Sequence, residues 1–492
     1  MTRAQSSSRA GESRLDRTTH SPMGSPAQSD YNEVKGNMMK STHRVGRAFR
    51  RTALIATVGV ALSASLVACS TTSGGTAKTG QAAITAALQK KTTLTMWGWA
   101  PGVQQEISAF EKKYPKVTVK LVNAGTGGDE YTKLQNAIKA GSGAPDVAQI
   151  EYFALPQFAL SGGLSDLGAL GLSSNKSKFA PAVWDSVTVN GTLVGLPQDT
   201  GPMALFYNKT IFDKYGLTVP KTWDEYVADA KKLHSADPNE YITNDTGDPG
   251  FVTSMIWDAG GHPYTVTGKT SVNINLQDAG SKKFADTWNQ LIQGGDLSPI
   301  SSWSSQWNQG LSNGTIASLI TGAWMPGNLE GSVAPTGKGD WRVAPMPTWT
   351  AGGAPATAEN GGSSDVVLKQ SKHQLAAAGF LQFLNASTQG TKIFVAAGNF
   401  PSINSILDSS SFTNAAPAYF GGQQINKVLS AAAKSVVPNW SYVPFQVYAN
   451  SIFSDTVGQA YSNKTDLNTA LKAWATATAS YGKQQGFTVT SK

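Results

Sequence analysis

Tryptophan is frequent in this chain, and several copies stand beside acidic or amide residues. The 492-residue sequence contains 13 Trp. The negative face of an indole ring packs against the apolar, slightly positive C–H face of a sugar ring. Carboxylate, amide and indole N–H groups can bond sugar hydroxyls in a dry cleft. These residue types together predict a carbohydrate-binding site.

The candidate ligand-binding residues lie in loops or at the ends of expected elements. They are Trp97, Trp99, Glu151, Asp199, Trp257, Asp258, Trp303, Trp307, Trp324, Trp440 and Tyr442. Each ring could instead belong to a core, and each carboxylate could be a solvated loop residue. Trp303 and Trp307 stand four residues apart on one helical face, so we expect one in the cleft and one in the core. Five further tryptophans are expected in the core: Trp184, Trp223, Trp288, Trp341 and Trp474.

Other site chemistries find little support in the sequence. The five His show no metal-ligand spacing, so no metal site is expected. The run Gly125 to Gly128 lacks the Lys-Ser/Thr of a phosphate-binding loop, and no G-x-S-x-G elbow is present. The sequence therefore predicts neither a cofactor nor an enzyme.

The positive charge of the chain is concentrated before residue 69. Residues 1–68 hold 10 of the 40 Lys and Arg and 4 of the 32 Asp and Glu, which leaves 30 basic and 28 acidic residues and a net charge of +2. A nearly neutral remainder argues against nucleic acid as a partner.

The folded part begins with an alternation typical of a parallel α/β sheet. Strands are expected over 92–97, 116–122 and 145–150, and helices over 103–114 and 129–140. Open sheets of this kind bind ligands at the carboxyl ends of their strands. Trp97 and Trp99 follow the first strand and Glu151 follows the third, so these candidates should meet at one edge.

The most distinctive stretch is Leu196 to Tyr226. Two prolines and a glycine between 197 and 202 exclude a helix interior, and Met203 to Tyr207 favours a strand. Thr222 and Glu225 have the spacing of a capping box at the start of a long helix. This stretch resembles the signature of the bacterial extracellular solute-binding proteins of carbohydrate ABC importers, the maltose-binding-protein-like family.

The resemblance extends from about residue 92 to 486 and implies a two-lobed α/β fold of the periplasmic-binding-protein type. Each lobe would have a mainly parallel sheet flanked by helices, and three crossings would form the hinge. The N-lobe would comprise 92–201 and 350–400, and the C-lobe 202–349 and 401–492. Trp324 ends the G-x-W element of the family, and Asn360, Gly361 and Gly362 resemble its turn that faces the ligand.

The resemblance also implies the partners. The ligand would be a sugar, with the tryptophan content favouring a di- or oligosaccharide, and the closed monomer would deliver it to a membrane permease driven by an ATPase. Two alternatives remain open at this point: a secreted glycoside hydrolase with two flanking carboxylates, and a receptor of the same fold for a non-sugar solute such as a polyamine.

The amino-terminal region predicts export and a lipid anchor. Residues 1–38 are interpreted as a disordered extension or a misassigned start, and 39–68 as a lipoprotein signal peptide with an apolar core over 52–66. Leu66 to Cys69 matches the lipoprotein box and ends at the only cysteine of the chain. Lipidation of Cys69, a flexible linker over 69–91 and a location on the extracellular face of the cell membrane are therefore expected.

Overall fold

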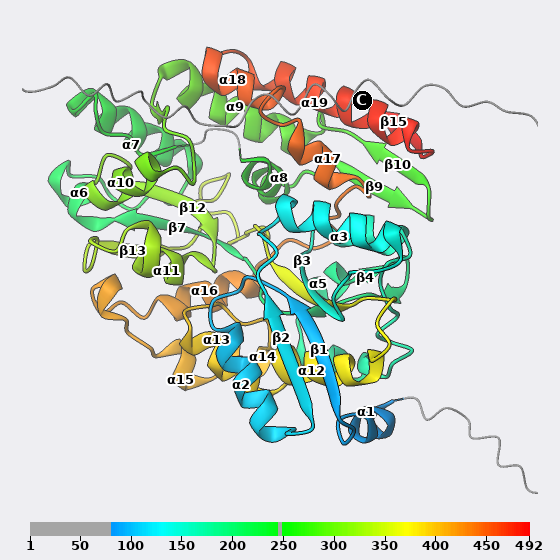
Figure 1. The fold of residues 1–492 in the computed structure, drawn as a ribbon. Coiled ribbons are helices and arrows are strands. Elements are labelled where there is room, and N and C mark those ends of the chain that lie inside the picture. Colours follow the sequence, from blue (N-terminus) through cyan, green and yellow to red (C-terminus); the bar gives the residue numbers. More distant parts are fainter. Residues whose placement is uncertain (1–79, 245–247) are drawn as a thin grey trace, which may run out of the picture. The chain divides into compact units, whose positions relative to one another are not determined.

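The computed structural model describes residues 80–244 and 248–492, which belong to one compact unit, Gly74–Lys492. The predicted signal peptide and the predicted lipidation site, Cys69, lie outside the described residues. No helix in the described part of the chain is long and apolar enough to cross a membrane. Figure 1 shows β1, β2 and α2 in the lower part of the molecule and α8, α9 and α19 in the upper part.

The N-lobe is built on a five-stranded sheet in the order β2-β1-β3-β14-β6. Its strands are β1 (Thr92–Trp97), β2 (Val117–Val122), β3 (Val147–Glu151), β14 (Ser363–Val367) and β6 (Leu196–Pro197). The first three are parallel, as expected, whereas β14 runs antiparallel to β3, and β6 runs antiparallel to β14 at the edge of the sheet. The helices and short strands of this lobe are α1 (Gln81–Ala87), α2 (Val103–Lys113), α3 (Gly128–Ala140), α4 (Leu155–Leu160), a 3₁₀ helix (Leu172–Lys178), α5 (Pro181–Ser186), β4 (Thr188–Val189), β5 (Thr192–Leu193), α12 (Gln374–Ala386) and α13 (Thr388–Ala396).

Helix α1 begins the ordered body earlier than the sequence suggested. The expected linker 69–91 contains this helix, and its Ile84 is fully buried with Leu88 in the N-lobe core. Both side chains pack near Gly379 of α12, where an added Cβ would lie 2.8 Å from Ile84. Burial of two aliphatic side chains explains why this short segment is held against the lobe.

The C-lobe contains three small sheets. They are β12-β7-β13 (Ser318–Gly322, Met203–Asn208, Trp341–Ala344), β15-β10-β9 (Thr488–Ser491, Ser271–Ile274, Tyr264–Thr267) and β11-β8 (Leu297–Ser298, Thr243–Asn244). The central sheet is antiparallel throughout, so the expectation of a mainly parallel sheet does not hold for this lobe. The reason is that β7 leaves the hinge while β13 returns toward it.

Helices cover both faces of β7 and enclose two cores. They are α6 (Lys209–Lys214), α7 (Trp223–Ala236), α8 (Pro249–Asp258), α9 (Ala279–Gly294), α10 (Ser305–Asn313), α11 (Met325–Asn328), a π-helix (Leu329–Val333), α14 (Asn404–Leu407), α15 (Ser410–Thr413), a 3₁₀ helix (Ala418–Phe420), α16 (Ile425–Lys434), α17 (Gln446–Ser451), α18 (Val457–Asn463) and α19 (Leu467–Gln484). Trp223, Trp288 and Trp474 lie in one core and Trp341 in the other. With Trp184 in the N-lobe core, all five tryptophans expected to be structural are buried.

Three segments cross between the lobes and pair with one another. Isolated bridges join Pro202 to Glu359 and Asp199 to Pro401, which links the crossings near residues 199–203, 357–362 and 400–403. A further segment near Val436 runs beside Thr357. These pairings agree with the prediction of three crossings between two lobes.

The first two crossings approach so closely that only glycine fits at position 201. A Cβ there would lie 2.1 Å from the carbonyl oxygen of Asn360. The Asn360 N–H donates to the Gly201 carbonyl at 2.8 Å, and the Gly201 N–H donates to the Glu359 carboxylate. Thr200 Oγ1 donates to the same carboxylate oxygen at 2.5 Å. The buried Glu359 therefore fixes the register of the hinge.

The helix start expected at Thr222 forms with one difference. Thr222 Oγ1 accepts the Glu225 N–H at 3.2 Å and caps α7, as predicted. The Glu225 carboxylate, however, accepts the N–H of Lys221 at 2.6 Å rather than that of Thr222. The cap thereby also holds the segment that precedes the helix.

We expect Gly201→Ala to destabilise the protein, because the added Cβ would clash with the backbone carbonyl of Asn360. The two crossings are bonded to each other at this point, so neither can move aside independently. The free energy of unfolding should fall by about 1–3 kcal/mol, measured by denaturant titration. Gly331→Ala is the control, since an added Cβ there meets no atom within 4 Å. Equal stability of the two variants would contradict the proposed contact.

Candidate functional site

The carboxyl edge of the N-lobe sheet brings the first candidates together. Trp97 ends β1, and the backbone N–H groups of Trp99 and Ala100 both donate to Gln149 Oε1 at 3.0 Å. The ring of Trp99 meets Tyr131 edge-on at 6.4 Å, and Tyr131 donates to Glu151 Oε2 at 2.9 Å. Both tryptophans are half-buried against the N-lobe core. Gln149 and Tyr131 thus position the loop and the carboxylate.

Carboxylates gather where the lobes meet, with no cation bound to them among the described residues. Burial, together with the charges of Asp199 and Asp248, raises the pKa of Glu151 to about 7. Burial likewise raises the pKa values of Asp199 and Glu359 to about 7. The three described ion pairs involve other residues. This region therefore favours a neutral ligand over an anionic one.

A line of aromatic rings connects the two lobes. Trp257 stacks on Trp440 at 4.8 Å and 28°, and Tyr442 meets Trp257 edge-on at 5.1 Å. Tyr442 also touches Phe153 of the N-lobe, with ring centroids 6.3 Å apart. Phe153 in turn lies 6.0 Å from Tyr131. Tyr442 packs against the cores of both lobes, so a movement of either lobe changes the contacts of this ring.

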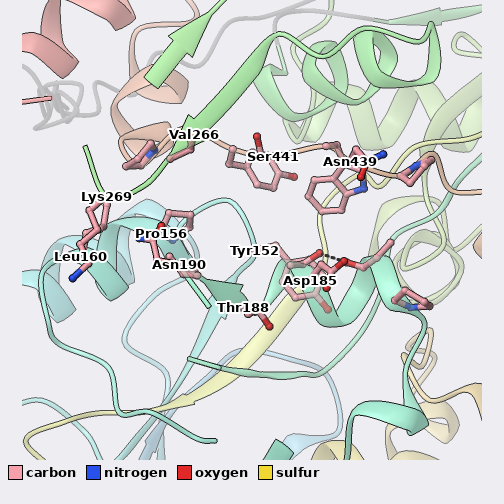
Figure 2. A pocket seen from close by; sticks show the side chains of 18 residues that line it. Tyr152, Pro156, Leu160, Asp185, Thr188, Asn190, Val266, Lys269, Asn439 and Ser441 are labelled. Atoms are coloured by element: carbon pink, nitrogen blue, oxygen red, sulfur yellow. Dashed lines mark hydrogen bonds between the residues drawn. The ribbon is translucent and has the colours of Figure 1, made fainter. Parts of the chain in front are cut away.

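A pocket of about 390 Å³ lies beside this line and takes its walls from both lobes. Figure 2 shows Tyr152, Asp185 and Thr188 of the N-lobe facing Val266, Asn439 and Ser441 of the C-lobe. The full lining is Tyr152, Pro156, Leu160, Pro181, Ala182, Asp185, Ser186, Thr188, Val189, Asn190, Val266, Lys269, Pro438, Asn439, Trp440, Ser441, Tyr442 and Pro444. This volume lies in the range of small-molecule binding pockets.

The Gly-Gly turn lies against Tyr152, which lines the larger pocket. Gly361 and Gly362 have φ angles of 78° and 92°, which favour glycine. A Cβ on Gly362 would lie 2.5 Å from the ring of Tyr152. The Tyr152 hydroxyl donates to the Asp199 carbonyl at 2.7 Å, and the Asp199 carboxylate accepts the Ser363 N–H at 2.5 Å. The turn and Asp199 therefore hold Tyr152 at the pocket wall.

A second aromatic cluster lies on the C-lobe side of the same turn. Trp324 donates its indole N–H to the Asn360 carbonyl at 2.8 Å and stacks on Trp303 at 5.8 Å. The Trp303 side chain is 55% exposed, whereas Trp307 is buried and donates to Asn244 Oδ1 at 2.7 Å. Trp303, Trp307 and Asp248 line a smaller pocket of about 50 Å³. This cluster places one exposed indole next to the turn.

Of the sequence-based candidates, Trp440 and Tyr442 line the larger pocket, and Trp303 and Trp307 line the smaller one. The others line neither pocket: Trp97, Trp99, Glu151, Asp199, Trp257, Asp258, Trp324, Asn360, Gly361 and Gly362. Asp258 is buried and accepts the indole N–H of Trp349 at 2.7 Å. Trp257 is also buried and supports Trp440 from behind. Asp258 thus has a structural partner, and Trp257 acts through its neighbour.

Several site residues were absent from the sequence-based candidates. Tyr152 directly follows Glu151, and Glu359 precedes the Asn360 turn, so adjacency was the available signal. Asp248 caps α8 and is followed by Pro249, which is a recognisable helix start. Asp185, Asn190 and Lys269 come from α5 and from two tight turns whose approach to the cleft depends on tertiary packing.

Residues 98–391 match the family described as "Bacterial extracellular solute-binding protein". The chain belongs to this family. A binding protein from Bifidobacterium animalis subsp. lactis Bl-04, solved with β-1,6-galactobiose, is 44% identical, with a TM-score of 0.74 over 81% of this chain and 99% of that one. The galacto-N-biose-/lacto-N-biose I-binding protein of Bifidobacterium longum, solved with lacto-N-biose, is 28% identical, with a TM-score of 0.70 over 81% and 98%.

Curated relatives agree with the structures. The arabinooligosaccharide-binding protein of Bacillus subtilis (strain 168) is 29% identical over 314 residues, which cover 61% of this chain and 71% of that protein. These comparisons confirm the predicted class, a solute-binding protein of the kind that serves carbohydrate ABC importers. The family is described as extracellular, and these relatives are named as binding proteins.

The buried carboxylates predict a pH dependence of stability. Their pKa values near 7 exceed the ordinary value, so the folded state binds more protons than the unfolded chain between about pH 4.5 and 7. The free energy of unfolding should therefore fall as the pH rises through this window. Thermal unfolding at about pH 5.5, inside this window, and at about pH 8, above it, measures the change in stability.

Glu359→Gln should flatten this dependence, because the amide oxygen still accepts the hinge bonds but carries no charge. Glu330→Gln, at an exposed site, is the matched control and should leave the slope unchanged. The pH range from about 6 to about 8 brackets the raised pKa values by about one unit on either side. If the free energy of unfolding of the wild-type protein rose across this range, the burial of these carboxylates would be contradicted.

Proposed function

We propose that this protein captures a neutral di- or oligosaccharide between its lobes and delivers it to an ABC permease. The observation that carries the proposal is the pocket of about 390 Å³ with walls from both lobes and with Tyr152, Trp440 and Tyr442 among its lining. One face of Trp440 is covered by Trp257. Its other face is available to stack on the C–H surface of a sugar.

Ligand binding favours the closed arrangement of the lobes. A ligand that touches both walls gains contacts only when the lobes are together, so it shifts the population toward closure. The hinge bonds at Gly201 and Glu359 keep the crossings in register while the lobes move. The closed form is the one that docks on the permease.

The size of the ligand is supported by the related structures. The two Bifidobacterium proteins were solved with galactobiose and lacto-N-biose, and the B. subtilis relative is named for arabinooligosaccharides. The exposed ring of Trp303, stacked on Trp324, offers a further stacking surface for a longer ligand. The chain acts by binding alone, so sugars incubated with it should be recovered unchanged.

The chain is anchored outside the cell through Cys69. Cleavage before this residue and attachment of a diacylglycerol would leave a monomeric receptor on a short tether. Cys69→Ser should move the protein from the membrane fraction to the medium, and labelled fatty acid should be incorporated only into the wild type. Equal partition of both proteins would contradict the anchor.

We expect Trp440→Ala to weaken sugar binding by about 30-fold, since a buried aromatic anchor is lost. Titration of intrinsic Trp fluorescence against a panel of neutral sugars, followed by calorimetry, measures it. Trp440→Phe keeps a stacking ring and should retain most of the affinity. Tyr448→Ala removes a ring that stacks on Tyr481 and should leave affinity unchanged.

The carboxylates of the site predict discrimination by charge. At pH 8 an oligosaccharide that carries a uronic acid should bind at least about tenfold more weakly than its neutral counterpart, because Glu151, Asp199 and Glu359 repel it. The difference in affinity between the acidic and the neutral sugar should narrow at about pH 5.5. This pH lies about one unit or more below the pKa values of the three carboxylates, so they bind protons there and lose their charge. Tighter binding of the acidic sugar would contradict this arrangement.

A further inference from the structure

The nearly neutral body of this protein is electrically polarised. The site between the lobes holds buried carboxylates, whereas lysines gather at the opposite edge of the N-lobe sheet. We call Lys90, Lys91, Lys112, Lys116, Lys369 and Lys372 the lysine edge; all six are exposed. Such a separation of charge on one folded body points to an anionic surface as a partner of that edge.

Strand register places these lysines on one side. Thr92 of β1 is opposite Val117 of β2, so the loops that hold Lys90, Lys91 and Lys116 leave the same edge. Val367, at the end of β14, pairs with Val147 at the start of β3, which brings Lys369 to that edge as well. The carboxyl ends of β1 and β3, with Trp97 and Glu151, face the other way. Figure 1 shows α1 and the start of β1 at the bottom of the N-lobe, away from α8 and α9.

The charges of the lysine edge are not neutralised by the protein. Within the described residues, no hydrogen bond or ion pair of these six ammonium groups is present, and the three ion pairs lie in the C-lobe. Three carboxylates lie near this edge, against six ammonium groups, and each of them accepts a backbone N–H. Glu111 accepts the Val119 N–H at 2.8 Å, Asp146 accepts the Thr95 N–H at 2.9 Å, and Asp166 accepts the Ala169 N–H at 3.1 Å. The edge therefore carries a net positive charge.

We infer that the lysine edge docks on the anionic phospholipid surface of the cell membrane. The inference rests on the proposed anchor for its geometry: ten residues, 70–79, separate Cys69 from Gly80. Fully extended, they span at most about 35 Å. Helix α1 follows this tether and lies beside the lysine edge, so the anchor delivers this edge, and not the cleft, to the lipid headgroups.

Docking in this pose has a consequence for ligand capture. The cleft lies at the carboxyl edge of the same sheet, so it faces away from the membrane while the lysine edge is bound. The receptor is then oriented to load sugar from outside and must let go of the lipid surface to present its cleft to the permease. Each lysine near an anionic surface increases the partition of the protein to the membrane about fivefold. An attraction of this size can orient the receptor on the membrane and still allow it to dissociate.

The test uses the chain from residue 69 with Cys69→Ser, which contains the whole compact unit and carries no lipid. Its sedimentation with vesicles of phosphatidylcholine, with and without phosphatidylglycerol, is measured. We expect binding only to the anionic vesicles and its loss in high salt, because screening shortens the range of the attraction. Lys90→Gln, Lys91→Gln, Lys112→Gln and Lys116→Gln together should lower partition at least about 100-fold.

The matched control replaces four exposed lysines of the C-lobe by Gln: Lys282, Lys427, Lys472 and Lys483. This control should keep vesicle binding, and both variants should keep sugar affinity, which shows that they fold. A second variant, Lys369→Gln with Lys372→Gln, should lower partition about 25-fold on its own.

Equal binding to neutral vesicles, no binding to anionic ones, or an equal loss in the control would overturn the inference. So would retention of the chain by a soluble anionic cell-wall polymer but not by vesicles. Because sugar titration is read independently, failure here is distinguishable from failure of the proposed function: the former leaves sugar binding intact.

Discussion

The close approach of Gly201 to the carbonyl of Asn360 is the constraint on which the rest of the structure depends. At this point the chain leaving the N-lobe passes the chain returning from the C-lobe, with no room for a side chain between them. Glu359 holds the pair together by accepting from Gly201 and Thr200. This register fixes the position of the Gly-Gly turn between the lobes, and both Tyr152 and Trp324 contact that turn.

Burying the carboxylate of Glu359 has an electrostatic cost, and the same buried carboxylates influence which ligand the site accepts. Burial raises the pKa values of Glu359, Asp199 and Glu151, and the charge of Asp199 adds to the effect on the other two. None of the three forms an ion pair with a lysine or arginine among the described residues. A neutral, hydroxyl-rich ligand satisfies such acceptors without adding charge, and Trp440 and Tyr442, which line the larger pocket, supply apolar contact. The same body carries its positive charge on the far edge of the N-lobe, so ligand and membrane would be met by opposite ends.

The fold could largely be predicted from the sequence, because its signals are local. The expected strand 92–97 and the Thr222 cap are present, although Glu225 bonds Lys221 instead of Thr222, and the five core tryptophans are buried. The antiparallel C-lobe sheet could not be read from periodicity, since alternation does not reveal strand direction. The site was harder for the same reason: Asp258 looks like Asp199 in sequence, yet only packing decides that it bonds Trp349. Asp185 and Lys269 reach the cleft through turns whose approach no local pattern encodes.

The measurement that tests the central claim most directly is a structure of this protein with the neutral sugar that binds it most tightly. The account requires one ligand in contact with both lobes at once, with a sugar ring on the free face of Trp440 and a hydroxyl within reach of the carboxylates beside Asn360. A ligand held by one lobe only, or lobes that remain apart around it, would contradict the account.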